Sequence, residues 1–378
     1  MLTPEQWETV GKQAIKIYEE LELEIIRTVA ERISSFTFAK SVVLNNLKIA
    51  QEMGMLYQDI ILLVAKYNNM SVTQVKKIFE SAGILSLKFD DNIYKMAGLE
   101  PLPLKQNQSM WKILEATAIK TNLDLKNLVM TTANTSQFQF YSAMNKAYME
   151  VTTGVKSYSQ AITESIKELS KEGAFIMYPN GTKRSLESAV RMNVLTSVNQ
   201  TCGVLQRMRA EEMGWDLMEI TAHSGARPEH AEWQGKIVSL SGKDGYLSLK
   251  DIGYGEVTGF KGVNCRHDWY PYFEGSSKTY SNEELEQFKN EFVVYNGEKI
   301  PKYEATQMQR KMERQIREDK RLINALESEL RSNNKSLDIE QVRQDLSTAK
   351  TKYTIHNNIL TDFLNQTKLR KDYTRLRI

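Results

Sequence analysis

Four side chains of the types that bind zinc lie in the middle of this 378-residue sequence. His223 and His230 come first, and Cys265 and His267 follow after a glycine-rich spacer. If the backbone is extended there, residues 265 and 267 point to the same side, as two ligands of one ion would. However, the spacing of the four residues matches no standard zinc module, and a Gly-Ala-Arg-Pro turn separates the first two histidines. The sequence therefore predicts no bound cofactor, with zinc held by these four residues as the alternative.

A structural role for these residues is the favoured interpretation, because the spacer between them is irregular. The spacer glycines are Gly242, Gly245, Gly253, Gly255, Gly259 and Gly262. A segment with little regular secondary structure needs side chains to satisfy its backbone N–H and C=O groups. We therefore expect the histidines to hydrogen-bond loop backbone, and Cys265 to be buried against Trp233 or Trp269.

Catalysis is the third interpretation of the same stretch. Arg227 and Glu229, together with His230 and His267, could form an acid–base site on the phosphate of a nucleotide or an RNA. The sequence has no serine nucleophile elbow and no phosphate-binding loop, and no paired carboxylates stand out. We therefore expect no enzyme activity, with a metal- or histidine-dependent nuclease or transferase acting on nucleic acid as the alternative.

The two ends of the stretch also carry a combined pattern. The first end contributes His223, Gly225, Arg227, Pro228, His230, Trp233, Gln234, Gly235 and Lys236, and the second contributes Asn264, Cys265, Arg266 and His267. This pattern resembles that of the phage minor head proteins, namely the Mu F-like group and, more closely, the phage minor capsid protein 2 family. Because the pattern is carried jointly, we expect the two ends to meet in one lobe, with the glycine-rich spacer looped out.

The resemblance covers the central and C-terminal thirds of the chain, and it implies a function. Members of this family are low-copy structural components of the virion, associated with the portal, that act in head assembly or in DNA ejection. The implied partners are the portal or other head proteins, with packaged DNA as a further candidate. The implied location is the virion, and the host cytoplasm during assembly.

Composition excludes several other classes of protein. The net charge of +3 gives no global field for nucleic-acid binding, so any such binding needs a local patch. Two cysteines rule out a disulfide scaffold and fit a reducing compartment. The N-terminus lacks the pattern of a signal peptide, and the longest early apolar run, residues 60–65, is too short to span a bilayer.

Helical periodicity dominates the chain outside the central stretch. Proline and glycine punctuation predicts four regions, which are residues 1–100, 104–172, 173–275 and 276–378. The first region should hold separate helices over residues 3–33, 38–53, 56–67 and 72–82, the first of them capped by Thr3 and Pro4. The fold class we expect is mainly α, with helical N-terminal and C-terminal regions around a small irregular α+β lobe.

The lobe region begins with turn and strand signals. The sequence predicts a hairpin over residues 175–183, a helix over 185–213 with Cys202 in its buried stripe, and strands over 215–221 and 236–240. The first of these strands should alternate, with one face buried. After the lobe region, the sequence predicts a short helix capped by Ser281, a kink at Gly297 and Pro301, and a long helix over residues 303–331.

Four arginines align along the predicted long helix. Arg310, Arg314, Arg317 and Arg321 recur at helical spacing, while the apolar stripe should pack against a helical pair over residues 338–372. We therefore expect the four arginines to be exposed together. They could be a solvated face, a contact for packaged DNA or a contact for an acidic protein neighbour, and the low net charge favours the protein neighbour.

Overall fold

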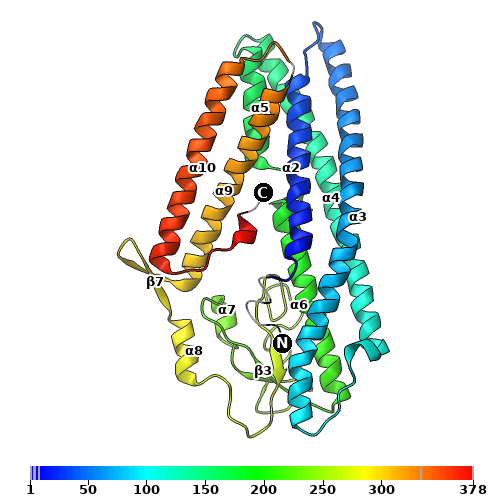
Figure 1. Cartoon of the computed structure of the whole chain (residues 1–378), viewed down its shortest axis with the longest axis vertical. Coiled ribbons are helices and arrows are strands. Elements are labelled where there is room, and N and C mark those ends of the chain that lie inside the picture. Colours follow the sequence, from blue (N-terminus) through cyan, green and yellow to red (C-terminus); the bar gives the residue numbers. More distant parts are fainter. Residues whose placement is uncertain (1, 3–5, 7–8, 333, 377–378) are drawn as a thin grey trace.

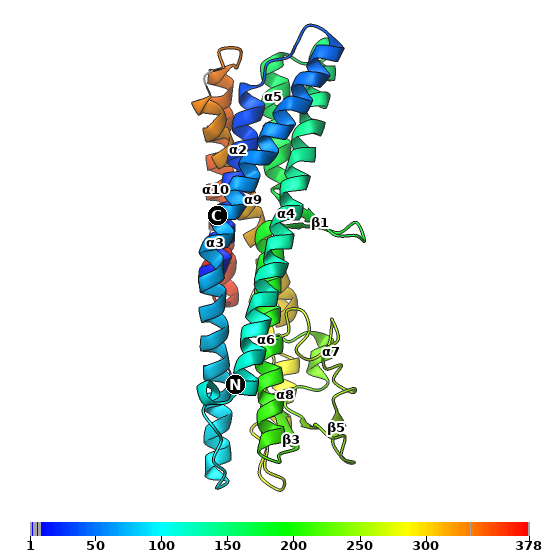
Figure 2. The same ribbon diagram turned by 90° about the vertical axis from the view of Figure 1, so that its right-hand side faces the viewer.

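Seven long helices form most of the part of the molecule that the structure describes. The structure, a computed structural model, describes residues 2, 6, 9–332 and 334–376. The helices are α2 (Lys12–Ser35), α3 (Val42–Met96), α4 (Gln108–Thr152), α5 (Tyr158–Glu172), α6 (Leu186–Glu212), α9 (Lys302–Arg331) and α10 (Ile339–Thr367). They run nearly parallel to one long axis, and a small lobe lies beside the lower part of α6 (Figures 1 and 2). One hydrophobic core joins all seven helices, so the expected mainly α class is confirmed. The division of the chain into four domains stays a prediction.

The N-terminal region differs from the expectation of several short helices. A single helix, α3, replaces the three helices expected between residues 38 and 82. Gly54 lies inside it, and a Cβ there would meet nothing within 4 Å. Gly83 also lies inside it, where a Cβ would approach Leu114 Cδ1 to 2.8 Å, so this glycine permits close helix packing rather than ending a helix. Asn68 stays helical and its side chain accepts a hydrogen bond from Tyr18 Oη at 3.2 Å.

The connection between the first two predicted regions, residues 101–103, contains Pro101 and Pro103 and is not helical. Helix α3 ends at Met96, and α4 begins at Gln108 after a short 3₁₀ turn, η1 (Leu104–Gln106). The expected helical content of residues 104–172 is provided by α4 and α5. The predicted caps Thr3 and Pro4 of the first helix lie outside the described residues, and α2 itself begins after Gly11, whose φ is +78°.

The predicted hairpin and the helix after it are confirmed. β1 (Phe175–Met177) pairs antiparallel with β2 (Lys183–Ser185). The Ser185 hydroxyl then accepts a hydrogen bond from the Ser188 amide at the start of α6. Cys202 is only 1% exposed on the buried stripe of α6, as expected for a core residue.

The lobe contains a four-stranded sheet in the order β5-β4-β3-β6. Its strands are β3 (Leu217–Ile220), β4 (Ile237–Ser239), β5 (Leu247–Ser248) and β6 (Trp269–Pro271). The expected alternation along β3 is wrong, because all four of its residues are buried. Met218 and Ile220 pack in the lobe core, while the buried Glu219 carboxylate accepts hydrogen bonds from the Thr279 backbone and hydroxyl.

The C-terminal region contains a second hairpin at the position where the sequence predicted a kink. Helix α8 (Asn282–Lys289) begins at the predicted cap Ser281, and then β7 (Phe292–Tyr295) pairs with β8 (Glu298–Pro301). The turn between these strands places Asn296 and Gly297 at φ +52° and +83°, which is the geometry that an Asn-Gly pair favours. Helix α9 follows directly and packs on α10, as the apolar stripe predicted, but also on α2 and α5. None of the described helices is long and apolar enough to cross a membrane.

The expectation that the four arginines of α9 are exposed together is wrong. Arg317 and Arg321 are 4% and 7% exposed, Arg310 is half-buried, and Arg314 alone of the four is exposed. The reason is that α9 faces buried carboxylates on other helices. Arg317 Nη2 lies 3.6 Å from Glu187 Oε2 of α6, and Arg321 Nη1 lies 3.7 Å from Glu22 Oε1 of α2.

These contacts belong to a buried charge network between α2, α6 and α9. Glu187 also accepts a hydrogen bond of 2.7 Å from Arg191 Nε, and its backbone N–H donates to Glu22 Oε2 at 2.9 Å. Burial alone would raise the pKa of Glu187, but Arg317 and Arg191 outweigh it and hold the pKa below its ordinary value. Glu22 has less compensation, so burial raises its pKa.

The buried carboxylate of Glu329 on α9 has little positive charge near it. Thr163 of α5 donates a 2.6 Å hydrogen bond to Glu329 Oε1, while Oε2 has no hydrogen-bond partner among the described residues. Burial raises the pKa of Glu329 to about 7 from an ordinary 4.5, and nearby Asp345 adds to the shift.

Replacing Arg317 with Gln should lower the free energy of unfolding by about 3 kcal/mol, because it removes one of the two arginines that form ion pairs with the buried Glu187. Replacing Arg314 with Gln, one turn away on the same helix, should change it by less than about 0.5 kcal/mol. Urea unfolding of the two variants measures both effects. Equal effects would contradict the burial of Arg317.

Glu329→Gln should stabilise the protein in a pH-dependent way. The folded-state pKa is raised, so the wild type loses stability as pH rises from about 4.5 through about 7. The variant lacks that loss, and each pKa unit corresponds to about 1.4 kcal/mol. Urea unfolding should therefore show the variant to be more stable than the wild type near pH 8, with a smaller difference near pH 4. A difference that does not change with pH would contradict this assignment.

Candidate functional site

The combined pattern has two ends, residues 223–236 and 264–267, and is called the His–Cys motif from here on. Its two ends meet in the lobe, as predicted. Arg227 Nη2 donates a 2.7 Å hydrogen bond to the Val263 carbonyl, across the whole length of the spacer. The short helix α7 (Pro228–Ala231) places His230 beside His267, with ring centroids 5.3 Å apart. The motif is therefore one structural unit.

The spacer is not looped out, which corrects that part of the expectation. Ile252 and Phe260 from the spacer are buried in the lobe core with Trp233 and Trp269. The spacer backbone also folds tightly on itself, because a Cβ at Gly259 would lie 2.0 Å from the Gly253 carbonyl oxygen. Its glycines therefore serve close backbone packing inside the lobe.

Gln234 connects the two ends of the motif through its amide oxygen. Oε1 accepts a 3.1 Å hydrogen bond from the His223 backbone N–H and lies 3.1 Å from His267 Nε2. A backbone N–H can only donate, so the amide oxygen is fixed at this position. His267 Nε2 must then carry a proton and donate it to Gln234.

The other two histidines of the lobe also donate to oxygen atoms. His223 Nδ1 lies 3.1 Å from the Ser224 carbonyl, and His230 Nε2 lies 2.7 Å from the Thr258 carbonyl. A carbonyl only accepts, so these nitrogens carry the protons, and the expectation that the histidines bind loop backbone is confirmed for His223 and His230. The His223 ring stacks on His267 at 4.4 Å. Burial lowers the pKa of all three histidines, and that of His267 falls well below its ordinary value.

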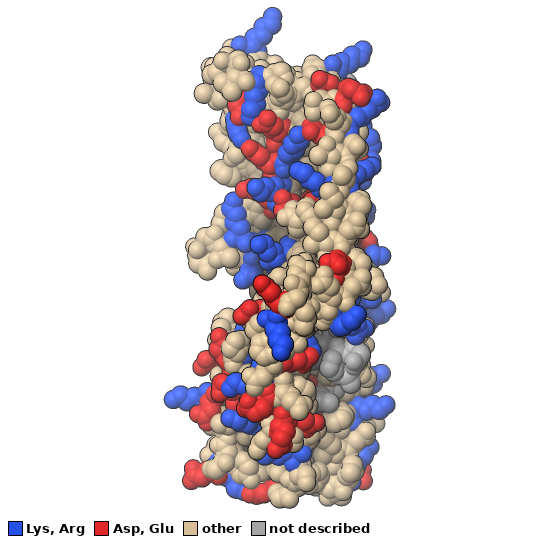
Figure 3. Space-filling view, turned by 90° about the vertical axis from the view of Figure 1, so that its left-hand side faces the viewer, with Lys and Arg blue, Asp and Glu red and all other residues tan. Residues whose placement is uncertain are grey.

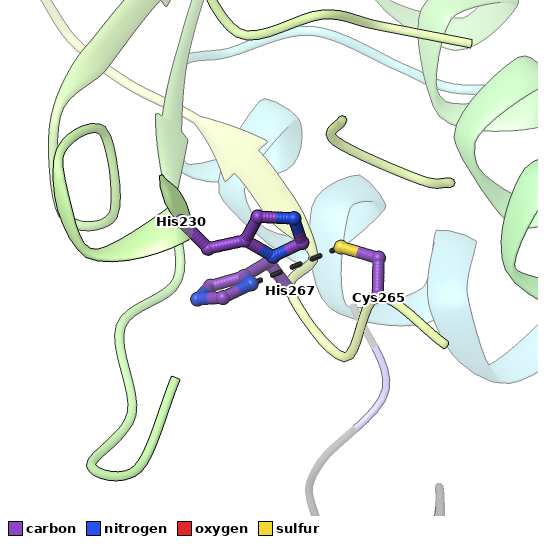
Figure 4. A group of neighbouring side chains, drawn as sticks. All are labelled: His230, Cys265 and His267. Carbon is purple, nitrogen blue, oxygen red and sulfur yellow. Dashed lines mark hydrogen bonds between the residues drawn. The ribbon is translucent and has the colours of Figure 1, made fainter. Parts of the chain in front are cut away.

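Cys265 is buried in the lobe core with Trp233 and Trp269, as expected. Its Sγ lies 3.8 Å from His267 Nδ1. Burial raises the pKa of the thiol. One ring nitrogen of His230, one of His267 and Cys265 Sγ all lie within 4.8 Å of one another (Figure 4). Among the described residues, these three side chains could share a metal ion. His223 stacks beside this set but is not part of it.

The lobe is attached to α6 by residues that were not predicted from the sequence. Asn199 Nδ2 donates to the Cys265 carbonyl at 2.9 Å, and Gln206 Nε2 donates to the Trp269 carbonyl at 2.9 Å. The Lys261 ammonium group bridges Asn199 Oδ1 at 3.0 Å and Asp268 Oδ1 at 2.6 Å, and both members of this ion pair are 1% exposed. Asn199 and Gln206 are two helical turns apart, and this spacing beside the apolar stripe was the signal that could have identified them.

A basic cavity of about 870 Å³ separates the lobe from α9 and the C-terminal residues. The three lobe histidines line one side, and the basic residues around it are Arg227, Arg266, Lys302, Arg310, Lys368, Arg370 and Arg375. Burial, with Arg375 and Arg266 nearby, lowers the pKa of Arg310 to about 10. Glu229 and Arg227 of the catalytic alternative line the same cavity, so the structure does bring those groups together.

Comparison with known proteins identifies the class. A structural protein of Lactococcus phage LL-H is 28% identical over 325 residues, which cover 81% of this chain and 83% of the relative. A structural protein of Lactococcus phage mv4 is 38% identical over 76 residues, or 19% of this chain and 50% of the relative. No solved structure matches the chain.

Residues 2–357 match the family described as phage minor capsid protein 2, and the chain belongs to that family. It is therefore a minor capsid protein, a structural component of the phage virion. The family match also extends through α2 and α3 in the N-terminal third of the chain, where the sequence showed no resemblance.

Gln234→Leu should lower the stability of the lobe, because it leaves the His223 N–H and His267 Nε2 buried without an acceptor. The expected cost is about 1–3 kcal/mol of the free energy of unfolding. The matched control is Gln287→Leu on the exposed surface of α8, which should stay within about 0.5 kcal/mol. Urea unfolding followed by tryptophan fluorescence reports on the lobe through Trp233 and Trp269. Stability unchanged in the Gln234 variant would contradict the bridging role.

Proposed function

We propose that this minor capsid protein docks on the portal through the outer faces of α3 and α4, and acts there in head assembly or DNA ejection without an enzymatic step. The observation that carries the proposal is a set of large apolar side chains exposed on both helices. On α3 they include Leu44, Leu47, Met55 and Leu62, and on α4 they include Ile119, Leu123, Phe138 and Met149. Their exposed fractions reach 71% at Leu62 and 67% at Phe138.

The spacing of these residues on α3 makes a second apolar face. Leu44, Met55 and Leu62 are separated by three and two helical turns, so they fall on one line of the helix. Ile49 and Ile60 lie on the opposite side and are fully buried in the bundle. A helix that is apolar on two sides is expected to be covered on both, and here the second cover must come from another protein.

A charged face elsewhere on the molecule supports the choice of α3 and α4 as the docking surface. The face over α8 and α10 carries Lys, Arg, Asp and Glu side chains interspersed, with acidic groups gathered in its lower half (Figure 3). There α8 presents exposed Glu283, Glu284 and Glu286. A charged face of this kind is suited to remain in solvent.

The portal is the partner that a minor component suits best. A protein present in few copies requires a site that occurs rarely in the head, and the portal occupies a single vertex of a tailed-phage head. The nuclease or transferase alternative has the basic cavity in its favour. Against it, His230 and His267 both donate Nε2–H to oxygens of the lobe itself, so these histidines already have a structural task.

The docking face can be tested with a triple variant, Leu44→Gln, Met55→Gln and Leu62→Gln. These positions are exposed, so the purified variant should unfold at the wild-type urea concentration. Its binding to purified portal protein, and its incorporation into heads when supplied to a phage that lacks the gene, should fall by about tenfold or more.

The matched control is Ile355→Gln with Ile359→Gln, two side chains exposed on α10 at 50% and 42%. This control should bind and incorporate normally. Normal incorporation of the α3 variant, or an equal defect in the control, would contradict docking through α3. Incorporation without binding to the portal would indicate a different head protein as the partner.

A further inference from the structure

The His–Cys cluster of the lobe has the composition of a transition-metal site. His230 comes from α7, while Cys265 and His267 precede β6, so the three residues approach from both ends of the motif. Their ligand atoms lie within 4.8 Å of one another, and the side chains are 2%, 7% and 1% exposed. Two imidazoles and one thiol are ligands that Zn²⁺ prefers, and they differ from the oxygen ligands of Mg²⁺ or Ca²⁺.

The hydrogen bonds of His230 and His267 leave one nitrogen of each ring free to bind a metal ion. His230 donates Nε2–H to the Thr258 carbonyl and His267 donates Nε2–H to Gln234 Oε1, which leaves a lone pair on Nδ1 of each ring. Metal-bound histidines commonly donate their second ring N–H to an oxygen in this way, since that contact fixes the tautomer and the ring orientation. Figure 4 shows the three side chains pointing toward one another.

The distance between the sulfur and the nearest imidazole is also close to that of a zinc site. Cys265 Sγ and His267 Nδ1 are 3.8 Å apart. Zn–S of about 2.3 Å and Zn–N of about 2.0–2.1 Å at a tetrahedral angle place the two donors about 3.6 Å apart. An ion could therefore enter with a small adjustment of the side chains.

Binding of the ion requires Cys265 to be a thiolate. The thiol proton would be released to solvent, and the ion would compensate the charge of the thiolate.

We propose that His230, Cys265 and His267 together bind one transition-metal ion of the Zn²⁺ class, which cross-links the two ends of the motif. Three protein ligands leave a fourth position for water or for His223. The Nε2 atom of His223 is buried and has no hydrogen-bond partner among the residues that the structure describes. The role of the ion is structural, because it closes a lobe that has few strands to hold it.

The chain offers matched controls for a metal analysis, because it has two cysteines and four histidines. Full-length protein without an affinity tag, produced in cells grown in zinc-containing medium, should carry about one equivalent of zinc. Cys265→Ser and His267→Gln should each lose it. Cys202→Ser, which changes the buried cysteine of α6, and His356→Gln, which changes the histidine of α10, should both retain it.

Two further measurements keep the test decisive if Cys265→Ser does not fold. Wild-type protein reconstituted with Co²⁺ should show sulfur-to-cobalt charge-transfer absorption, and so should Cys202→Ser. Removal of metal with a chelator should lower the wild-type Tm by several degrees, and added Zn²⁺ should restore it. Wild-type protein that is metal-free and whose Tm does not respond to Zn²⁺ would overturn the proposal. Zinc retained by Cys265→Ser would overturn it as well.

Discussion

Helix α6 packs against two different parts of the molecule along its length, namely the helical bundle and the lobe. The rest of the structure depends on both of these contacts. Its N-terminal half carries Val190, Val194 and Val198, all fully buried in the hydrophobic core of the bundle. Its C-terminal half carries Asn199 and Gln206, whose amides donate hydrogen bonds to the carbonyls of Cys265 and Trp269. The bundle therefore holds α6 by apolar packing, and α6 holds the lobe by directed hydrogen bonds.

Polar groups buried at both ends of α6 make these contacts specific. Near the N-terminus, Glu187 faces arginines of α6 and α9, and near the lobe, Lys261 faces Asp268 and Asn199. Burying charges is expensive, and the cost is offset only when the partners are in place. A register in which these helices slide past one another would leave such charges unpaired. Contacts of α9 with Glu187 of α6 and Glu22 of α2 account for the burial of Arg317 and Arg321, two arginines that the sequence pattern predicted to be exposed.

Features that depend on residues close together in the sequence could be predicted, whereas features that depend on contacts between distant residues could not. The hairpin at Asn180–Gly181, the cap at Ser185 and the buried stripe through Cys202 follow from local preferences, and the structure confirms them. Helix α3 continues through Gly54 and Gly83, where local rules placed helix ends. At Gly83 the reason lies in neighbours distant in sequence, because a Cβ there would meet Leu114 and Leu205. Burial of Arg317 could not be foreseen for the same reason, because its partner Glu187 lies on another helix.

The candidate site shows the same difference between what was predicted and what was not. The joint pattern around His230 and His267 correctly predicted that the two ends of the motif meet. The residues that attach the motif to α6 were not predicted. Asn199 and Gln206 have a spacing of two helical turns that could have identified them, whereas a lone Lys such as Lys261 gives no periodic signal. The Asn-Gly pair at residues 296–297 was a signal that predicts a hairpin, and only its interpretation as a kink was wrong.

The central physical claim is that the lobe and the bundle open together because α6 belongs to both. Native-state hydrogen exchange on the full chain measures this directly, since it gives an opening free energy for each protected amide. We predict that the slowest amides of β3 and β6 exchange with the same free energy as those in the middle of α6, and respond equally to low urea. Lobe amides that exchange through a separate opening of lower energy, while α6 stays protected, would contradict the account.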